Sequence, residues 1–438
     1  MFELPKYGEG ICLARLAALL ESLAVNREWL ERRSVVVTGS NGKGSTAAFC
    51  ASIGNAHGLR TGLFTSPHLY RINERFQIDG SPIGDGELAN LAARVSAGIA
   101  RVSARLSQRF GAFEAMFALA CLYFQESRCD FAVFEAGIGG RYDPVRLVET
   151  RVTCVTSVDY EHVELLGNSL ELIASDKSDA CASGGTVVYG ENCLNLKPHL
   201  LEYNRHREVA SLFVREQIVI DGEVASASGQ RFGYRFEGQD FPALEIGVLG
   251  GFQFNNAAIA VTLFLLWLRE SRPQTIPAAI ESTIRSGLRE TRWPGRLEVI
   301  EKNPLTVIDV GHTPDGIKQS LTSLRSIHGT DGWILVTGAS ADKKADEIVR
   351  ALAPAFRIII CTKAYHKGTD AQTIAASVRA ANPNARVDVT ATIEDSVELS
   401  RSLAKSRNRK IYVPGGLFLA IEFATVARGG NARDLTFF

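Results

Sequence analysis

The chain has 438 residues, of which 46% are hydrophobic and 22% are charged, a composition typical of soluble globular proteins and unlike that of disordered ones. Lysine plus arginine number 48 and aspartate plus glutamate also number 48, so the formal net charge is zero. Bulk electrostatics therefore give no support for a nucleic-acid partner. At roughly 100–200 residues per domain, this length predicts two or three domains.

No segment predicts a membrane span or a secretion signal. The most notable apolar run, residues 257–268, ends at Arg269 and is shorter than the roughly 20 residues that a span requires, so we expect a buried helix. The N-terminal residues include two acidic side chains and no apolar signal core, which favours a cytoplasmic protein without membrane partners. Eight cysteines form no CxxC pair, which is typical of reduced thiols in a protein core.

Helix-like and β-rich runs alternate through most of the chain, which predicts an α/β fold with a parallel sheet. In the first part, residues 35–37, 130–135 and 152–158 read as buried strands, and apolar residues at helical spacing over 113–124 predict a core helix. Residues 218–224 resemble a hairpin with an Asp-Gly turn, so an antiparallel patch is expected there.

A second α/β series follows Trp293-Pro-Gly-Arg296. Its predicted strands are residues 306–310, 333–337, 357–361, 387–390 and 410–413. Because proline and glycine punctuate the chain between these two parts, we expect a domain boundary here. The prediction is an N-terminal domain of residues 1–298, a smaller C-terminal domain of residues 299–438, and a substrate cleft between them.

The strongest motif is TGSNGKGST at residues 38–46, which follows a predicted strand and precedes a predicted helix. Glycines let backbone N–H groups turn towards phosphate oxygens, and the start of the helix adds a favourable dipole. Lys43 supplies a cation for the β- and γ-phosphates, and the Ser45 hydroxyl can reach Mg²⁺. One glycine separates Lys43 from Ser45, unlike the usual GxxxxGK[ST] spacing. A tight strand–helix connection is the alternative, but the whole context favours nucleotide binding.

With this loop the sequence begins to resemble the Mur-ligase superfamily, in particular the folylpolyglutamate synthase and dihydrofolate synthase family. The resemblance continues in order over residues 34–420. The matching segments are 65–69 (TSPHL), 74–76 (ERF), 113–114 (FE), 135–143 (EAGIGGRYD), 162–167, 173–177, 253–257, 293–296 and 309–312 (DVGH), with weaker matches at 341–343 and 415–418. The resemblance implies a P-loop ATPase domain with a parallel sheet, followed by a smaller Rossmann-like α/β domain.

The family reaction is ADP-forming amide synthesis, in which a carboxylate accepts the γ-phosphate of ATP and an amino-acid amine attacks the acyl phosphate. The resemblance implies nucleotide contacts at Asn41, Gly42, Lys43, Gly44, Ser45, Thr46, Gln253, Asn256, Arg296 and Asp309. It also implies that one or two Mg²⁺ ions are held by Ser66, Glu135 and His162, with Ser45 touching the nucleotide-bound ion.

Lys177 matches the carbamylated lysine of the family, and a carbamate can hold a second Mg²⁺. The alternative is an ordinary ammonium paired with Asp176 and Asp179, which disfavour the neutral amine that carbamylation requires. On the resemblance we expect the carbamate. The expected catalytic residues are Lys43, Glu135, His162 and Lys177.

The substrate-end motifs depart from the family pattern. Its Leu-Asp-Ala-Thr-Asn segment reads YDPVR at residues 142–146, its Asn after the motif histidine is Thr313, and its C-terminal Ser is Gly416. The expected substrate contacts are Arg75, Arg141, His312 and Gly416.

Two substrate hypotheses therefore stay open. The first is a ligase that adds glutamate to dihydropteroate or a folate, and the second is a repurposed ligase that joins another acid to an amino acid or amine. A non-catalytic nucleotide-binding protein and an NTPase coupled to motion are disfavoured, because the expected catalytic residues and the second-domain motifs are present. We expect small-molecule substrates and, from the resemblance, a monomer.

Overall fold

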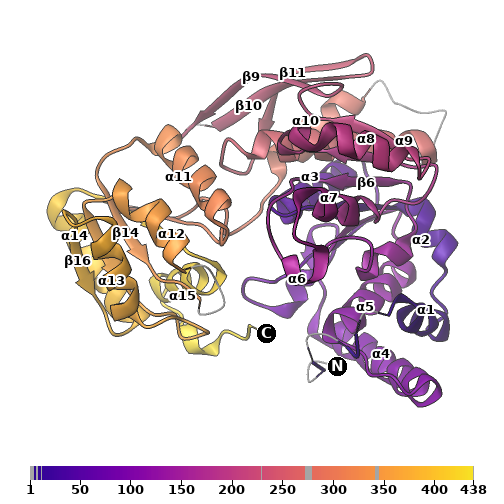
Figure 1. The fold of residues 1–438 in the computed structure, drawn as a ribbon, viewed down its shortest axis with the longest axis horizontal. Coiled ribbons are helices and arrows are strands. Elements are labelled where there is room, and N and C mark those ends of the chain that lie inside the picture. Colours follow the sequence, from indigo (N-terminus) through magenta and orange to yellow (C-terminus); the bar gives the residue numbers. More distant parts are fainter. Residues whose placement is uncertain are drawn as a thin grey trace.

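The computed structural model describes residues 4, 5, 8–10, 12–227, 229–271, 279–340 and 345–437. Figure 1 shows two bodies side by side, the larger built from the indigo-to-magenta part of the chain and the smaller from the orange-to-yellow part. The described residues form sheets of eight, three and six strands, and the six-stranded sheet begins at Glu298. The predicted α/β class is confirmed.

The eight-stranded sheet is mostly parallel and forms the centre of the larger body. Its strands, in spatial order, are β4 (Ser81–Pro82), β3 (Phe76–Ile78), β2 (Thr61–Phe64), β5 (Phe131–Glu135), β1 (Ser34–Thr38), β6 (Val152–Val155), β7 (Thr186–Tyr189) and β8 (Ala210–Phe213). Among the described strands of this sheet, the pairs β2–β3 and β3–β4 are antiparallel and the others are parallel. The predicted strands at β1, β5 and β6 are confirmed, and each is buried along its length because both faces of the sheet are covered.

Helices cover both faces of this sheet. Val35 and Val37 of β1 join a core with α3, α9 and α10, whereas Val36 joins a core with α1, α4 and α5 on the opposite face. The helices of this body are α1 (Leu13–Ser22), α2 (Arg27–Arg33), α3 (Lys43–Ala56), α4 (Asp85–Leu106), α5 (Ala112–Glu126), α6 (Val163–Leu166), α7 (Leu170–Ser178), α8 (Lys197–Arg205), α9 (Gln253–Ser271) and α10 (Ile280–Glu290). The predicted helices at residues 113–124 and 257–268 lie in α5 and α9, and both are buried in the core.

The three-stranded sheet consists of β9 (Val219–Ser226), β10 (Gly229–Phe236) and β11 (Gln239–Ile246), all antiparallel. The antiparallel patch was predicted correctly, but the prediction of a hairpin turn at Asp221-Gly222 was wrong. β9 runs through both residues, and its register against β10 shifts there while Gly222 takes φ +57°. Asp-Gly thus forms a β-bulge within a strand rather than a turn, because a left-handed glycine suits both structures.

The smaller body is a second parallel sheet with one antiparallel edge strand. The strands, in spatial order, are β12 (Glu298–Lys302), β13 (Leu305–Ile308), β17 (Lys410–Val413), β14 (Trp333–Thr337), β15 (Ile358–Cys361) and β16 (Arg386–Val389). One face packs against α11 (Pro314–His328), α12 (Ala345–Leu352) and α13 (Ala371–Ala381), and the other packs against α14 (Ile393–Arg407) and α15 (Leu417–Ala427). All five strands predicted in this part are confirmed.

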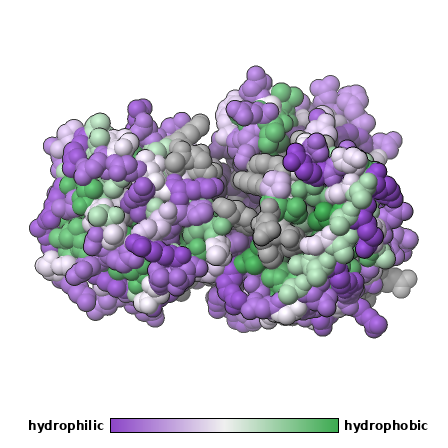
Figure 2. All heavy atoms as spheres, turned by 90° about the horizontal axis from the view of Figure 1, so that it is seen from below, coloured by the Kyte–Doolittle hydropathy of each residue, from purple (hydrophilic) through white to green (hydrophobic). Residues whose placement is uncertain are grey.

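The molecular surface agrees with the composition. Seen from below, it is mainly hydrophilic, and a constriction separates the two bodies (Figure 2). Within the described ranges no helix combines the length and apolar character needed to cross a bilayer. All eight cysteines are free, and seven are buried, as the apolar surroundings predicted.

Candidate functional site

The phosphate loop, which we define as residues 39–42, joins β1 to α3. Gly39 has φ +138° and Gly42 has φ +90°, so both occupy backbone conformations that side chains disfavour. A Cβ atom on Gly39 would lie 1.9 Å from Thr156 Oγ1, and one on Gly42 would lie 2.5 Å from Asn256 Oδ1. Both positions therefore require glycine, because the loop packs against Thr156 and Asn256, and the loop ends at the start of a helix, where an anion is stabilised.

Lys43 is the first residue of α3, and its ammonium group contacts the phosphate loop. Its Nζ donates hydrogen bonds to the carbonyl oxygens of Gly39 at 2.8 Å and Ser40 at 3.2 Å. Its charge opposes the burial that raises the pKa of Glu135, and together with Lys177 it outweighs burial at Glu161 and lowers the pKa of that carboxyl group. One ammonium group thus contacts the phosphate loop and acts electrostatically on two carboxyl groups near it.

Glu135 stands at the carboxyl end of β5 and is only 4% exposed. Burial raises its pKa to about 7, against the opposing charges of Lys43, Arg296 and Arg75 and the hydrogen bond from the backbone N–H of Ser66 at 2.9 Å. The structure thus brings together two of the predicted metal ligands, Ser66 and Glu135, with the predicted substrate contact Arg75.

Lys177, on α7, is 1% exposed and pairs with a residue that the sequence did not single out as its partner. Its Nζ lies 2.7 Å from Glu161 Oε1. Burial lowers the pKa of Lys177, since a charged amine is costly in the protein interior. Burial alone would raise the pKa of Glu161, but Lys43 and Lys177 outweigh it and lower that pKa to about 2.

The two aspartates expected beside Lys177 have other partners. Asp176 Oδ1 accepts hydrogen bonds from the backbone N–H groups of Gly140 at 2.9 Å and Arg141 at 3.4 Å. Asp179 accepts the Arg141 Nε–H at 2.5 Å and the Tyr203 hydroxyl at 2.8 Å. The sequence signal that could have singled out Glu161 was its position beside His162, where the family carries an aspartate.

His162 and Arg141 occupy peripheral positions. His162 is exposed at the start of α6 with φ +45°, immediately after Glu161. Arg141 commits Nε to Asp179 and donates Nη2–H to Tyr203 Oη at 2.9 Å, so its guanidinium is held within the larger body. Their roles as metal ligand and substrate contact stay predictions.

A chain of amides connects α9 to the first turn of α3. Asn256 donates to Gln253 Oε1 at 2.9 Å, and Gln253 Nε2 donates to Ser45 Oγ at 3.3 Å. The Trp293 ring would lie 2.7 Å from a Cβ atom on Gly44. The predicted nucleotide residues of α9 therefore lie directly against the predicted phosphate-binding turn.

The second sheet supplies its predicted residues from the carboxyl ends of β13 and β17. Asp309 is fully buried and accepts hydrogen bonds from the backbone N–H groups of Leu297 at 3.0 Å and Gly311 at 2.8 Å. Burial raises its pKa, and the charge of Arg296 opposes that shift. Asp309 therefore acts as a clamp, since its carboxylate holds the backbone of the segment that connects the two bodies. The sequence alone did not reveal this role.

His312 and Gly416 meet at the same edge of this sheet. A Cβ atom on Gly416 would lie 3.9 Å from His312 Cβ, and Gly416 has φ +117°. The neighbouring Thr313 donates its hydroxyl hydrogen to Asn41 Oδ1 of the phosphate loop at 3.1 Å. The carboxyl edges of the two parallel sheets thus face each other across the phosphate loop. The weakly matching segment 341–343 lies outside the described residues.

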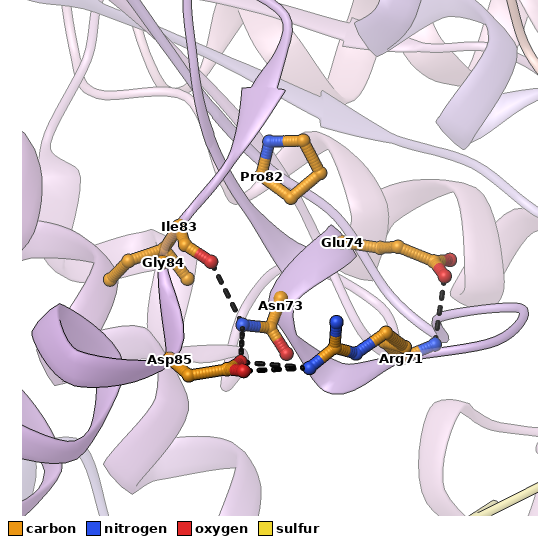
Figure 3. A pocket seen from close by; sticks show the side chains of 7 residues that line it. All are labelled: Arg71, Asn73, Glu74, Pro82, Ile83, Gly84 and Asp85. Atoms are coloured by element: carbon orange, nitrogen blue, oxygen red, sulfur yellow. Dashed lines mark hydrogen bonds and ion pairs between the residues drawn. The ribbon is translucent and has the colours of Figure 1, made fainter.

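The substrate-loop segment after β2 is held by Glu74, whose carboxylate accepts backbone N–H groups of Leu69, Tyr70 and Arg71 at 2.8–3.0 Å. Beside it lies a shallow cavity of about 360 Å³ (Figure 3). Its polar groups bind one another, since Asp85 accepts from both Arg71 and Asn73 at 2.9 Å. None of the predicted site residues lines this cavity, so it lies apart from the candidate site.

The residues present fit ATP and Mg²⁺. The phosphate loop ends at the N-terminus of α3, and the Thr46 hydroxyl in the first turn of that helix is buried without a hydrogen-bond partner in the described structure. No group of three or more His, Cys, Asp or Glu side chains within the described ranges is arranged around a cation position. One carboxylate with hydroxyl, phosphate and water oxygens is the ligand set typical of Mg²⁺ at a nucleotide.

Comparisons with known proteins agree with this geometry. Residues 295–413 match the family model described as Mur ligase, glutamate ligase domain. The folylpolyglutamate synthase of Lacticaseibacillus casei is 31% identical over 95% of each chain, and the dihydrofolate synthase/folylpolyglutamate synthase of Bacillus subtilis is 30% identical over 79% of this chain and 80% of its own. A solved complex of a folylpolyglutamate synthase with AMPPCP and folate superposes with a TM-score of 0.81 at 28% identity, covering 96% of each chain.

These similarities agree with the two-body α/β architecture. They also agree with a phosphate loop that has a lysine and a buried carboxylate beside it. The chain belongs to the folylpolyglutamate synthase/dihydrofolate synthase family of Mur ligases.

Proposed function

We propose that this protein is an ATP-dependent ligase that joins the amine of L-glutamate to the carboxylate of dihydropteroate or a folate, with release of ADP and phosphate. The observation that carries the proposal is the placement of Lys43 and Glu135 at a phosphate loop that the second body reaches through Thr313. The names of the relatives support the substrates, since they are folylpolyglutamate and dihydrofolate synthases.

The reaction has two bond-forming steps. ATP supplies the γ-phosphoryl group, which an oxygen of the acid's carboxylate accepts, so that ADP leaves. The amine of glutamate then forms the amide bond with the activated carbonyl carbon, and phosphate leaves while the nitrogen loses a proton. Lys43 and the N–H groups at the start of α3 stabilise the negative charge that both steps place on the phosphate oxygens. Closure of the second body over the site would exclude water from the activated acid.

Mg²⁺ would be held by Glu135, Ser66 and His162, with Ser45 at the nucleotide, and it would neutralise charge between the carboxylate and the phosphates. A carbamate on Lys177 would add a further anionic oxygen ligand. The lowered pKa of Lys177 supports this modification, because CO₂ reacts with the neutral amine. Glu161 opposes it by pairing with the ammonium, so carbamylation must break the Lys177–Glu161 contact.

The substrates would lie between the two bodies. Arg75 and Arg141 would serve the acid, and His312 with Gly416 would serve the amino acid. Gln253, Asn256, Arg296 and Asp309 would surround the nucleotide. We also propose a domain boundary after residue 298, a monomeric state and a cytoplasmic location.

A pooled ligation assay tests the proposal. The purified protein is incubated with ATP, Mg²⁺, bicarbonate, dihydropteroate, tetrahydrofolate and the proteinogenic amino acids, and mass spectrometry follows new amides together with ADP. A glutamylated pterin that is absent with Lys43→Ala supports the proposal. ADP release without any pterin product would overturn the substrate assignment and direct the search to other acids and amines.

A further inference from the structure

The C-terminal segment leaves the smaller body and contacts the larger one. The carbonyl oxygen of Thr436 lies 2.9 Å from His68 Nε2, in the segment that follows β2. Figure 1 shows the C-terminus between the two bodies. We name residues 435–437 the strap. A contact of this kind links the end of the second body directly to the segment that precedes Arg75.

The strap is anchored on the smaller body by aromatic packing. The ring of Phe437 lies 4.8 Å from the Phe418 ring and 5.2 Å from the His366 ring, measured between centroids. Glu422 fixes the segment that carries His366, since its carboxylate accepts the backbone N–H of that residue at 2.9 Å. The anchor is therefore built from groups that are themselves held in place.

His68 transmits the strap contact to Arg75. Arg75 Nε–H donates to His68 Nδ1 at 2.9 Å, and because a guanidinium only donates, Nδ1 is the unprotonated nitrogen of the ring. The proton is therefore on Nε2, from which it is donated to the Thr436 carbonyl. His68 is 5% exposed and Arg75 is 3% exposed, so the contact between them is shielded from bulk water, whereas Thr436 at the other end is exposed. Burial lowers the pKa of His68, which is consistent with the neutral ring.

Arg75 in turn is tied to Glu135 through the segment after β2, since its carbonyl oxygen accepts the N–H of Thr65 at 3.1 Å and the N–H of Ser66 donates to Glu135 at 2.9 Å. The chain of contacts thus runs from the end of the second body to the carboxylate beside the phosphate loop. We propose that the strap and His68 together hold the Arg75 guanidinium in its working orientation, with His68 as a positioning residue. This rests on the proposed function only in that Arg75 serves the acid substrate.

Closure of the two bodies then has a direct effect on the acid-binding end. With the strap in place, the His68 ring is fixed by a hydrogen bond on each nitrogen, and Nδ1 stays turned towards Arg75. When the second body moves away, the Thr436 contact is lost and the ring loses one of the two hydrogen bonds that orient it, which weakens its hold on Arg75 Nε. The orientation of Arg75 is therefore coupled to the arrangement of the two bodies.

We call the two contacts of His68, with Arg75 and with Thr436, the relay. Two substitutions of His68 remove these contacts one at a time. In His68→Asn the amide oxygen takes the place of Nδ1 and can still accept from Arg75, but nothing reaches Thr436. In His68→Gln the amide nitrogen takes the place of Nε2 and can still donate to Thr436, but Arg75 loses its acceptor. A chain ending at Asp434 removes the strap itself, and His206→Asn, an exposed histidine elsewhere, is the matched control.

The first readout is backbone hydrogen exchange over residues 66–75 in the full protein without substrates, which does not depend on ligation. We expect faster exchange in the chain ending at Asp434 and in His68→Asn, with no further increase when the two changes are combined, because both remove the same bond. Unchanged exchange in the shortened chain, or fully additive effects, would overturn the proposal.

The second readout is the ligation reaction. We expect the KM for the acid to rise about tenfold in the shortened chain and in His68→Gln, while the KM for ATP and the thermal midpoint stay those of the control. A parallel loss in thermal midpoint and in both KM values would instead indicate a merely structural contact and would refute the positioning role. If no pterin product forms, the exchange experiment alone decides the proposal, so the two failures are distinguishable.

Discussion

Replacement of Asp309 by alanine is expected to destabilise the protein even without nucleotide. The carboxylate is fully buried, and its two oxygens accept the backbone N–H groups of Leu297 and Gly311. Each buried donor left without a partner costs about 1–3 kcal/mol, so the loss for two donors is about 2–6 kcal/mol. Asp309→Asn keeps one acceptor and should therefore lose about half as much as the alanine variant.

Urea unfolding followed by circular dichroism measures this loss as a shift in midpoint at an unchanged slope. Asp331→Ala is the control, since that carboxylate is exposed in the same body, and it should change the unfolding free energy by no more than about 0.5 kcal/mol. A loss of unfolding free energy below about 1 kcal/mol in Asp309→Ala would refute the structural role of Asp309 as a clamp. Only its predicted role as a nucleotide contact would then stay.

Lys43→Ala should lower the ligation kcat by about 10²–10³-fold without changing the circular dichroism spectrum, and wild-type turnover would exclude Lys43 as a phosphate contact. Arg15→Ala should cost about 3–5 kcal/mol in thermal or urea unfolding, because Arg15 is 1% exposed and its removal takes the cationic partner from Glu114, whose side chain is 14% exposed. Arg32→Ala, which breaks an exposed ion pair within α2, should cost less than about 1 kcal/mol, and equal losses in the two variants would contradict the argument. Glu161 has its pKa lowered to about 2, so its stabilising effect is complete above about pH 4.5 and disappears as the pH falls towards 2. The unfolding free energy of Glu161→Gln measured with a chelator should therefore converge with that of the wild type in this range, and a constant difference would count against the assignment.

Features encoded within a short stretch of chain could be predicted from the sequence. The phosphate loop was found because its glycines, lysine and hydroxyl are adjacent, and strands such as β1 and β5 were found because burial on both faces requires a continuous apolar run. The prediction of a turn at Asp221-Gly222 was wrong because the signal was equally local, and a bulge and a hairpin turn use the same dipeptide.

Features that depend on contacts between distant residues could not be predicted in this way. Glu161 as the partner of Lys177, and the backbone groups held by Asp309, depend on which chain segments pack together. The relay through His68 joins residues 368 positions apart, and no periodicity or spacing encodes such a contact. The family resemblance predicts which residues surround the site, whereas their hydrogen-bond and ion-pair partners became visible only in the folded chain.

The contact between Thr313 and Asn41 has a thermodynamic consequence. The Thr313 hydroxyl accepts the Gly316 N–H at the start of α11 and donates its single hydrogen to Asn41 Oδ1. A ligand that draws the Asn41 carboxamide towards itself therefore competes with the bond between the bodies, and a rearrangement of the bodies changes the affinity of the loop by the same factor. One hydroxyl group thus couples ligand binding at the loop to the arrangement of the two bodies.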